Sequence, residues 1–289
     1  MVLTKILNNV FSELSQREKD VIFRRFGFEG EEETLEELAQ DYNLTRERIR
    51  QIQEKALQKI VPVLKSDPEV TFFMEKSKKF LRPIGVRREQ TFLNLAQKEF
   101  NFTYQEIKIF KFFAIFSQKI IFYKGDEDFY NFYALEEEIL EICRHLLKKI
   151  YFHLLESRQL YTEDELLNLT LKEIKRHLKI EPKAEDLLDF LKILKNIGKN
   201  PFNLWGLRSN NFITPRCLKD KIILIFKLEK KPLHFREIYQ KLHELARIED
   251  ESIHYFWHKN YNINSIKNEL IRHPDFILIK RGVYYLRND

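Results

Sequence analysis

The chain has 289 residues, of which 44% are hydrophobic and 13% aromatic, and its formal net charge is +6. This length allows two or three domains, and this composition excludes an intrinsically disordered chain. No apolar run approaches the roughly 18 residues that cross a bilayer, the N-terminus lacks a signal-peptide pattern, and two cysteines are too few for a disulfide framework. We therefore expect a cytoplasmic protein whose charge permits an anionic partner without requiring one.

Helix starts are marked by a repeated pattern, a Ser or Thr followed three residues later by Glu. These two side chains satisfy amide groups that the first turn of a helix leaves unpaired. The pattern occurs at Ser15/Glu18, Thr34/Glu37, Thr103/Glu106, Thr162/Glu165 and Thr170/Glu173. Because Gly and Pro are also few, the sequence predicts a mainly α-helical fold.

Two breaks divide the chain into three expected parts. Pro68 and the preceding Asp67 disfavour a continued helix, and the segment 196–216 is rich in Asn, Gly and Pro. We expect a helix-turn-helix in 1–66, a helical, aromatic-rich middle region in 67–211, and a winged helix with a small β-hairpin in 212–289.

The N-terminal part predicts a helix-turn-helix. Residues 35–44 form a short apolar-periodic segment and a tight turn, and residues 45–60 form a longer amphipathic helix. The apolar arc of the longer helix consists of Ile49, Ile52, Ala56 and Ile60. In this arrangement the second helix enters the major groove of DNA.

The polar face of the longer helix carries planar side chains that can reach base edges, beside a basic flank suited to phosphates. The candidates for base reading are Arg46, Glu47, Arg50 and Gln51, and those for the DNA backbone are Thr45, Arg48, Lys55 and Lys59. The alternative is an amphipathic helical hairpin with a solvated charged face.

The segments LSQREKDVIFRRFGF and TLEELAQDYNLTRERIRQIQEKALQKI, about residues 14–60, resemble region 4 of the sigma-70 family of bacterial RNA polymerase sigma factors. The resemblance implies that Arg46, Glu47 and Gln51 read the −35 promoter element. It also implies that Arg48 and Arg50 hold backbone- or DNA-facing positions of the same helix, and that residues 14–28 dock on the flap of the polymerase β subunit. No segment resembles sigma region 2, so an autonomous initiation factor is not expected.

The C-terminal part predicts two helices in 220–245, the second starting near His234, and a third helix that runs into a hairpin in 262–286. The segments KPLHFREIYQKL and HPDFILIKRGVYYL resemble the HARE-type winged helix of the delta subunit of bacterial RNA polymerase and of chromatin- and restriction-linked proteins. The candidate DNA contacts here are Asn264, Lys267, Asn268, Arg272, Lys280 and Arg281. Since winged helices also bind proteins, both kinds of partner stay open.

The middle region predicts a helix, a turn, a helix and two β-rich runs over 89–135, consistent with a degenerate winged helix, and a third helical unit over 161–207 that ends in a small strand. Its phenylalanines are expected in the core. His254 and His258 lack a third ligand, and no phosphate-binding loop or activated cysteine is present. We expect no enzymatic activity, no cofactor and no metal.

These features together predict a DNA-binding transcription factor. It would recognise −35-like promoter duplex DNA and associate with bacterial RNA polymerase in initiation or its regulation. Two alternatives remain: a delta-like polymerase accessory subunit acting through protein contacts, and the DNA-reading subunit of a restriction or phage-defence system.

Overall fold

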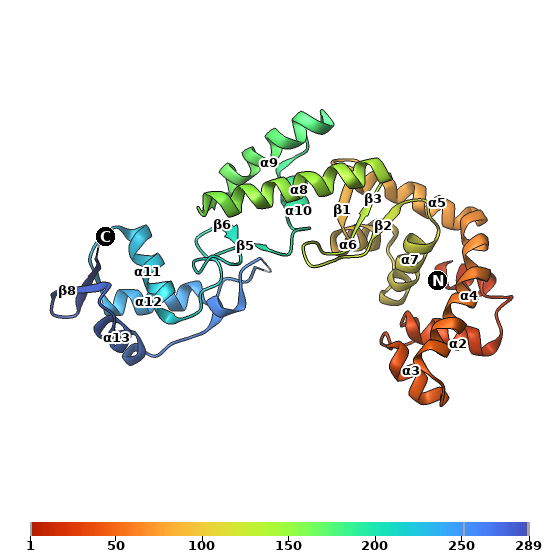
Figure 1. Cartoon of the computed structure of the whole chain (residues 1–289), viewed down its shortest axis with the longest axis horizontal. Coiled ribbons are helices and arrows are strands. Elements are labelled where there is room, and N and C mark those ends of the chain that lie inside the picture. The colour runs from red at the N-terminus through yellow and green to blue at the C-terminus, as the bar shows by residue number, and fades with distance from the viewer. Residues whose placement is uncertain (1, 251, 288–289) are drawn as a thin grey trace. The chain divides into compact units, whose positions relative to one another are not determined.

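The computed structural model describes residues 2–250 and 252–287 (Figure 1). The fold is mainly helical, as predicted, with small antiparallel sheets of three strands each. The chain forms two compact units: residues up to 145 together with 174–193, and residues 146–173 together with those from 194 onward. None of the described helices is long and apolar enough to cross a membrane.

The N-terminal module, residues 2–66, contains four helices. They are α1 (Val2–Val10), α2 (Gln16–Arg25), α3 (Leu35–Tyr42) and α4 (Arg46–Ser66). The predicted capping boxes at Ser15/Glu18 and Thr34/Glu37 are present and start α2 and α3. The predicted break follows α4, where the extended backbone of Asp67 separates it from the next helix.

The rest of the chain uses one order of elements three times: helix, strand, helix, helix, strand, strand. The first repeat contains α5 (Pro68–Ser77), β1 (Val86–Arg88), α6 (Glu89–Phe100), α7 (Tyr104–Phe116), β2 (Ile121–Tyr123) and β3 (Phe132–Ala134). The second contains α8 (Glu137–Ser157), β4 (Tyr161–Thr162), α9 (Glu163–Leu178), α10 (Ala184–Leu191), β5 (Ile197–Lys199) and β6 (Leu204–Leu207). The third contains α11 (Leu218–Glu229), β7 (Leu233–His234), α12 (Phe235–Leu245), α13 (Ile263–Arg272), β8 (Phe276–Lys280) and β9 (Val283–Leu286).

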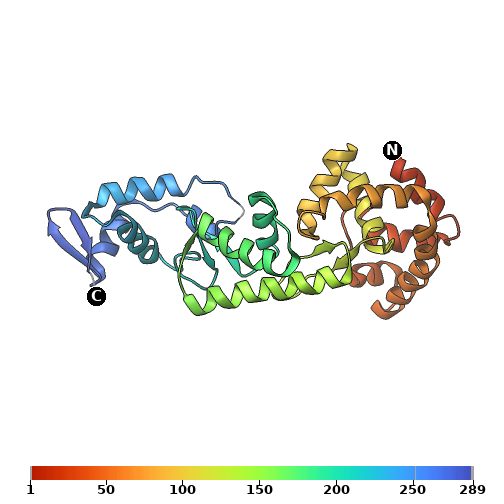
Figure 2. The ribbon, with the colours of Figure 1, turned by 90° about the horizontal axis from the view of Figure 1, so that it is seen from above.

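All three sheets share one topology. The strand orders are β1-β3-β2, β4-β6-β5 and β7-β9-β8, so the last strand of each repeat lies in the centre of its sheet. Two 3₁₀ turns, η1 (Lys78–Phe80) and η2 (Tyr255–His258), are additions to the first and third repeats. Figure 2 shows from above that the long α8 is one uninterrupted helix.

The repeats also match residue by residue around the first strand of each. In the three repeats this strand ends at Arg88, Thr162 and His234, and a helix follows directly. Four positions after the strand end, each repeat has a fully buried apolar residue: Phe92, Leu166 and Ile238, respectively. The residue before the strand end pairs with a buried aromatic residue in the central strand: Arg87 with Tyr133, Tyr161 with Trp205, and Leu233 with Tyr284. One structural template therefore accounts for most of the chain.

The predicted elements of these repeats are largely confirmed. The two β-rich runs are β2 and β3, the small strand near 204 is β6, and the C-terminal hairpin is β8 and β9. One predicted helix start is wrong. Thr170 lies inside α9, where its buried hydroxyl donates to the carbonyl of Leu166. The helix begins after Thr162, whose hydroxyl accepts from the amide of Glu165, so the predicted start at Thr162/Glu165 is confirmed.

In the first compact unit, α10 packs on β1 through a buried arginine. The guanidinium of Arg87 lies 2.8 Å from a carboxylate oxygen of Asp186 and 3.6 Å from one of Asp189, and it donates to the carbonyl of Phe80 at 2.9 Å. Burial raises the pKa of Asp189, although Thr91 and Arg87 offset part of this effect. Arg87 therefore neutralises two acidic groups that α10 brings against the first repeat.

We predict that Arg87→Met lowers the free energy of unfolding of the first compact unit by about 3–5 kcal/mol, because buried carboxylates lose their cation. The loss should be larger at pH 8 than at pH 5, since a carboxyl group with a raised pKa destabilises the fold once it must ionise. Urea unfolding at both pH values measures this. The exposed Arg82→Met is the control, and an equal, small effect of both substitutions would contradict the assignment.

Candidate nucleic-acid interface

The turn between α3 and α4 is closed by local hydrogen bonds. Asn43 adopts a left-handed backbone with φ of 55°, and the amide of Leu44 donates to the carbonyl of Ala39 at 2.9 Å. The hydroxyl of Thr45 accepts from the amide of Arg48 at 3.1 Å and caps α4. These bonds fix the angle at which α4 leaves the turn, so the predicted helix-turn-helix is confirmed.

The apolar arc predicted for α4 is buried. Ile49, Ala56 and Ile60 are 0% exposed and Ile52 is 9% exposed. The first half of this arc packs with Leu38 and Ala39 of α3 and Val21 of α2. The small Ala39, at 3% exposure, allows α3 and α4 to approach closely.

Charged hydrogen bonds hold α2 against the helix-turn-helix. Arg24 in α2 donates to Glu33 at 2.8 Å through Nε and also contacts Asp41 at the end of α3. Arg25 donates to the carbonyl of Glu33 at 2.7 Å. Part of the acidic segment that precedes α3 is thereby tied to α2, and such charge-assisted bonds orient α3 and α4 relative to it.

The predicted DNA-reading side chains lie together on the exposed side of the first turns of α4. The exposed residues are Thr45, Arg46, Glu47, Arg48, Arg50, Gln51 and Lys55. No side-chain hydrogen bond or ion pair joins Arg46 to another described residue, although its charge helps to lower the pKa of Glu47. Arg46 is therefore ready to bind an external acceptor.

The other planar side chains on this face pair with one another. Arg50 lies 2.7 Å from Glu47 and also pairs with Glu54, and Arg48 donates to Gln51 at 3.1 Å. The hydrogen bonds from Arg50 lower the pKa of Glu47, which keeps this carboxylate ionised. Arg50 and Gln51 must exchange these partners for any contact with a base.

Lys59, predicted as a DNA-backbone contact, lies apart from this exposed group. Its Nζ is 2.8 and 2.9 Å from the two carboxylate oxygens of Glu18 in α2. Burial would raise the pKa of Glu18, but hydrogen bonds from Lys59 and Ser15 lower it to about 2. Lys59 therefore has a partner inside the module and joins α4 to α2.

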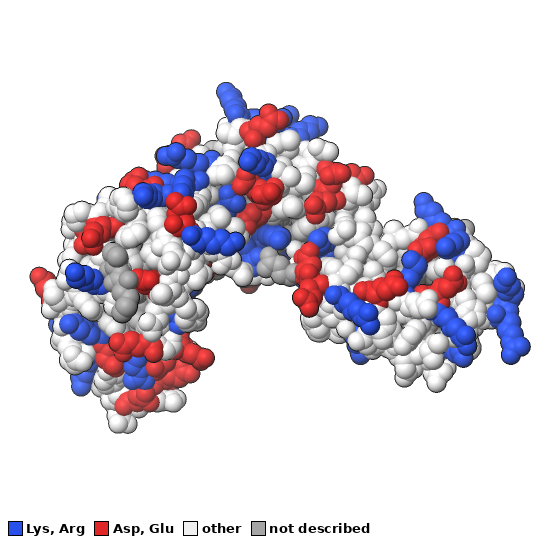
Figure 3. Space-filling view, turned by 180° about the vertical axis from the view of Figure 1, so that it is seen from behind, with Lys and Arg blue, Asp and Glu red and all other residues white. Residues whose placement is uncertain are grey.

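The two candidate DNA-binding regions differ in charge. Residues 10–60 hold nine Lys and Arg against twelve Asp and Glu, whereas residues 212–289 hold fifteen against ten. Red acidic side chains gather over the N-terminal module at the lower left of Figure 3. Long-range attraction to phosphates therefore favours the third repeat, and the proposed recognition of DNA by the N-terminal module would depend on local contacts of α4.

In the third repeat, α13 presents a polar outer face. Asn264, Asn268 and Arg272 are exposed and spaced four residues apart, which places them on one side of the helix. Lys267 is half-buried, with its Nζ 4.5 Å from the ring centre of Phe235. Lys280 and Arg281 are exposed at the hairpin turn, where Gly282 has φ of 77°.

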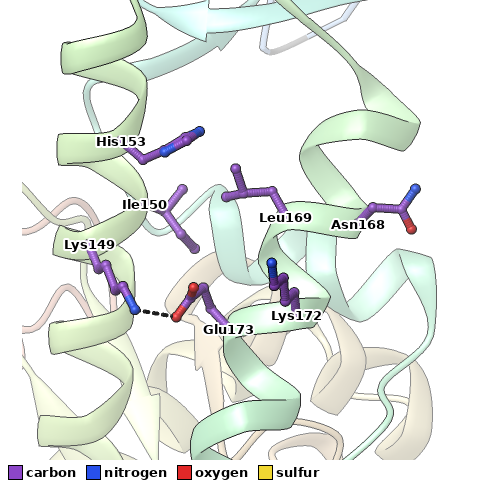
Figure 4. Close-up of a pocket in the computed structure, with 7 residues that line it drawn as sticks. All are labelled: Lys149, Ile150, His153, Asn168, Leu169, Lys172 and Glu173. Carbon is purple, nitrogen blue, oxygen red and sulfur yellow. Dashed lines mark hydrogen bonds and ion pairs between the residues drawn. The ribbon is translucent and has the colours of Figure 1, made fainter.

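A groove lies between α8 and α9 in the second compact unit, and its lining differs from the exposed polar faces of α4 and α13 (Figure 4). It is lined by Lys149, Ile150, His153, Asn168, Leu169, Lys172 and Glu173. Lys149 and Glu173 form an ion pair at 2.6 Å, and apolar Ile150 and Leu169 lie beside it. Among the described residues, no group of His, Cys, Asp or Glu could hold a metal ion, and burial raises the pKa of the Cys143 thiol to about 12.

Comparison with known proteins assigns the region that contains α4. Residues 10–60 match the family model for sigma-70, region 4. The chain is 52% identical over 60 residues to the RNA polymerase sigma factor SigA of Microcystis aeruginosa and to that of Synechocystis, and 51% identical over 59 residues to that of Clostridium acetobutylicum. Residues 10–60, which include α2, α3 and most of α4, thus form a sigma-70 region 4 domain.

The similarity to these three relatives covers only 20% of this chain and 14–15% of their own length. No solved structure matches the chain. The three repeats after residue 67 therefore have no assigned family.

We predict that Lys59→Met raises the pKa of Glu18 from about 2 toward or above its ordinary value of 4.5. Because a depressed carboxyl pKa stabilises the fold above its unfolded-state value, the substitution should cost on the order of 2 kcal/mol at pH 7. This difference should shrink as the pH falls from about 4.5 toward 2. Carbon-13 NMR titration of Glu18 and urea unfolding measure both effects.

Lys55→Met is the matched control, because Lys55 is an exposed lysine of the same helix. It should leave the titration of Glu18 unchanged. Equal losses of stability from the two substitutions would show that the ion pair contributes nothing specific.

Proposed function

We propose that this chain is a DNA-binding transcription factor that recognises −35-like promoter DNA through α4. Bacterial RNA polymerase is its proposed partner, in initiation or in the regulation of initiation. The observation that supports this most strongly is the sigma-70 region 4 domain with its capped, exposed α4 face. The match ends at residue 60, so the other activities of a sigma factor are not part of the proposal.

The proposed mechanism is recognition by hydrogen bonds in the major groove. Arg46 donates two hydrogen bonds to guanine, Glu47 accepts from a cytosine amino group, and Gln51 bonds adenine. Arg50 joins the base contacts once DNA replaces its acidic partners. Thr45, Arg48 and Lys55 contact phosphates at the helix start and along the basic flank, which sets the register of α4 on the duplex.

A second DNA contact is proposed for the third repeat. We propose that it is a winged helix of the HARE type, and its order of helix, strand, helix, helix and hairpin supports this proposal. In this arrangement α13 enters the groove with Asn264, Lys267, Asn268 and Arg272, and Lys280 and Arg281 contact the backbone. The excess of Lys and Arg in residues 212–289 favours this over a purely protein-binding role.

Two other functions stay as alternatives. A delta-like accessory subunit would bind core polymerase through the third repeat and show no sequence-selective DNA binding. A DNA-reading subunit of a restriction or defence system would bind a specific sequence without polymerase. Both use the same surfaces, so binding measurements with and without core polymerase distinguish them.

We predict that Arg46→Ala weakens binding to the preferred duplex by about 1–3 kcal/mol and relaxes base preference at one position, because a contact to a base edge is lost. Lys55→Ala should weaken binding to all duplexes equally and reduce its salt dependence. Fluorescence anisotropy over a series of single-base-pair variants and salt concentrations measures both. If Arg46→Ala reduced binding to every duplex equally, Arg46 would be a phosphate contact.

We also predict that Lys280→Ala combined with Arg281→Ala reduces affinity for long duplexes and lowers the salt slope by about two, because two phosphate contacts are removed. The preferred sequence read by α4 should stay the same. Co-purification with core polymerase is the second readout. Unchanged DNA affinity together with loss of polymerase would favour the accessory-subunit alternative.

A further inference from the structure

The N-terminal module has an apolar face, separate from the polar face of α4, and it is not open to solvent. This face is formed by α2, the turn that follows it and the second half of α4. Its residues include Ile22, Phe23, Phe26, Phe28, Leu57 and Ile60. Phe28 is 4% exposed and Ile22 and Ile60 are 0% exposed.

The helix α7 of the first repeat covers this face (Figure 1). The ring centre of Phe112 lies 4.9 Å from that of Phe26 and 5.4 Å from that of Phe28, in edge-to-face geometry. The ring of Phe116 lies 5.6 Å from Phe26, also edge to face. Phe112 is only 1% exposed, so this contact forms part of the core of the first compact unit.

Two lysines of α7 bind the loop beside the apolar face. The Nζ of Lys108 donates to the carbonyls of Gly27 at 2.9 Å and Gly30 at 2.6 Å, and Lys111 lies 3.8 Å from Glu32. This loop is acidic, with Glu at positions 29 and 31–33. Helix α7 therefore packs its phenylalanines against the apolar face of the module and places its lysines beside the acidic loop.

Helix α7 holds the position in the first repeat that α13 holds in the third. In α13 this position presents exposed Asn264, Asn268 and Arg272, whereas in α7 it presents phenylalanines that are buried against the module. The equivalent helix of the second repeat, α10, packs on β1 through Asp186 and Asp189. The third helix of a repeat can therefore serve as a docking element in this chain.

We propose that the β flap of RNA polymerase binds this apolar face, as the sigma resemblance implies for residues 14–28, and that α7 and the flap therefore compete for the N-terminal module. Region 4 domains bind both promoter DNA and this flap. The choice of competitor rests on the proposed function. While α7 is docked, the polar face of α4 stays exposed, so DNA binding does not need the flap, whereas flap binding requires α7 to leave.

The test measures binding of the full chain to a purified β-flap fragment and to promoter duplex in the same preparations. Two variants weaken α7 docking in different ways: Lys108→Glu removes the hydrogen bonds to Gly27 and Gly30 and opposes the acidic loop, and Phe116→Ala removes one ring. The matched control is Phe122→Ala, which removes a ring of the same repeat that packs on Tyr133 instead. Circular dichroism confirms that each variant is folded.

We expect both docking variants to bind the flap at least tenfold more tightly than the unmodified chain and the control. Excess flap should leave DNA binding by the unmodified chain unchanged. Where the flap binds, hydrogen exchange of amides 104–116 should increase, because α7 has been displaced.

Two results would overturn the proposal. One is a flap affinity that rises in neither docking variant, and the other is flap binding with amides 104–116 still protected. Failure of the proposed function is a separate result, namely no sequence-selective binding of duplex by any form. In that case the exchange of residues 104–116 in the docking variants still reports whether α7 holds the module.

Discussion

Packing of the N-terminal phenylalanines against α7 is the contact on which the first compact unit depends. Phe11, Phe26 and Phe28 share one core with Phe112, so a sigma-70 region 4 domain of about fifty residues is stabilised by the repeat that follows it. Small domains bury little apolar surface by themselves, and a shared core supplies what they lack. The same packing leaves the polar face of α4 exposed, so stability and recognition use different sides of the module.

The three repeats show how one template can take different roles. Their buried positions are the same, since Phe92, Leu166 and Ile238 follow the first strand at equal spacing. Their third helices differ: α7 packs on the N-terminal module, α10 packs on β1, and α13 presents exposed Asn264, Asn268 and Arg272. Differences on the surface of one helix thus separate internal docking from proposed contact with DNA.

Much of this could be predicted from the sequence, because the relevant signals are local. Capping pairs such as Thr34/Glu37 and the isoleucine spacing in α4 identified helix starts and buried sides correctly. The first strands β1, β4 and β7 were missed because each has only two or three residues and no alternation to detect. Thr170 matched a capping pattern inside α9, since the pattern does not record that the helix had already begun. The partner of Lys59 is forty-one residues away in the chain, and spacing along one helix could not reveal it.

The proposed recognition of a specific promoter-like sequence by α4 is tested most directly by selection of bound sites from a random duplex library, with and without core RNA polymerase. We expect the chain alone to enrich a TTGACA-like hexamer, with stronger enrichment or longer sites when polymerase is present. No enriched sequence in either arm would contradict this proposal.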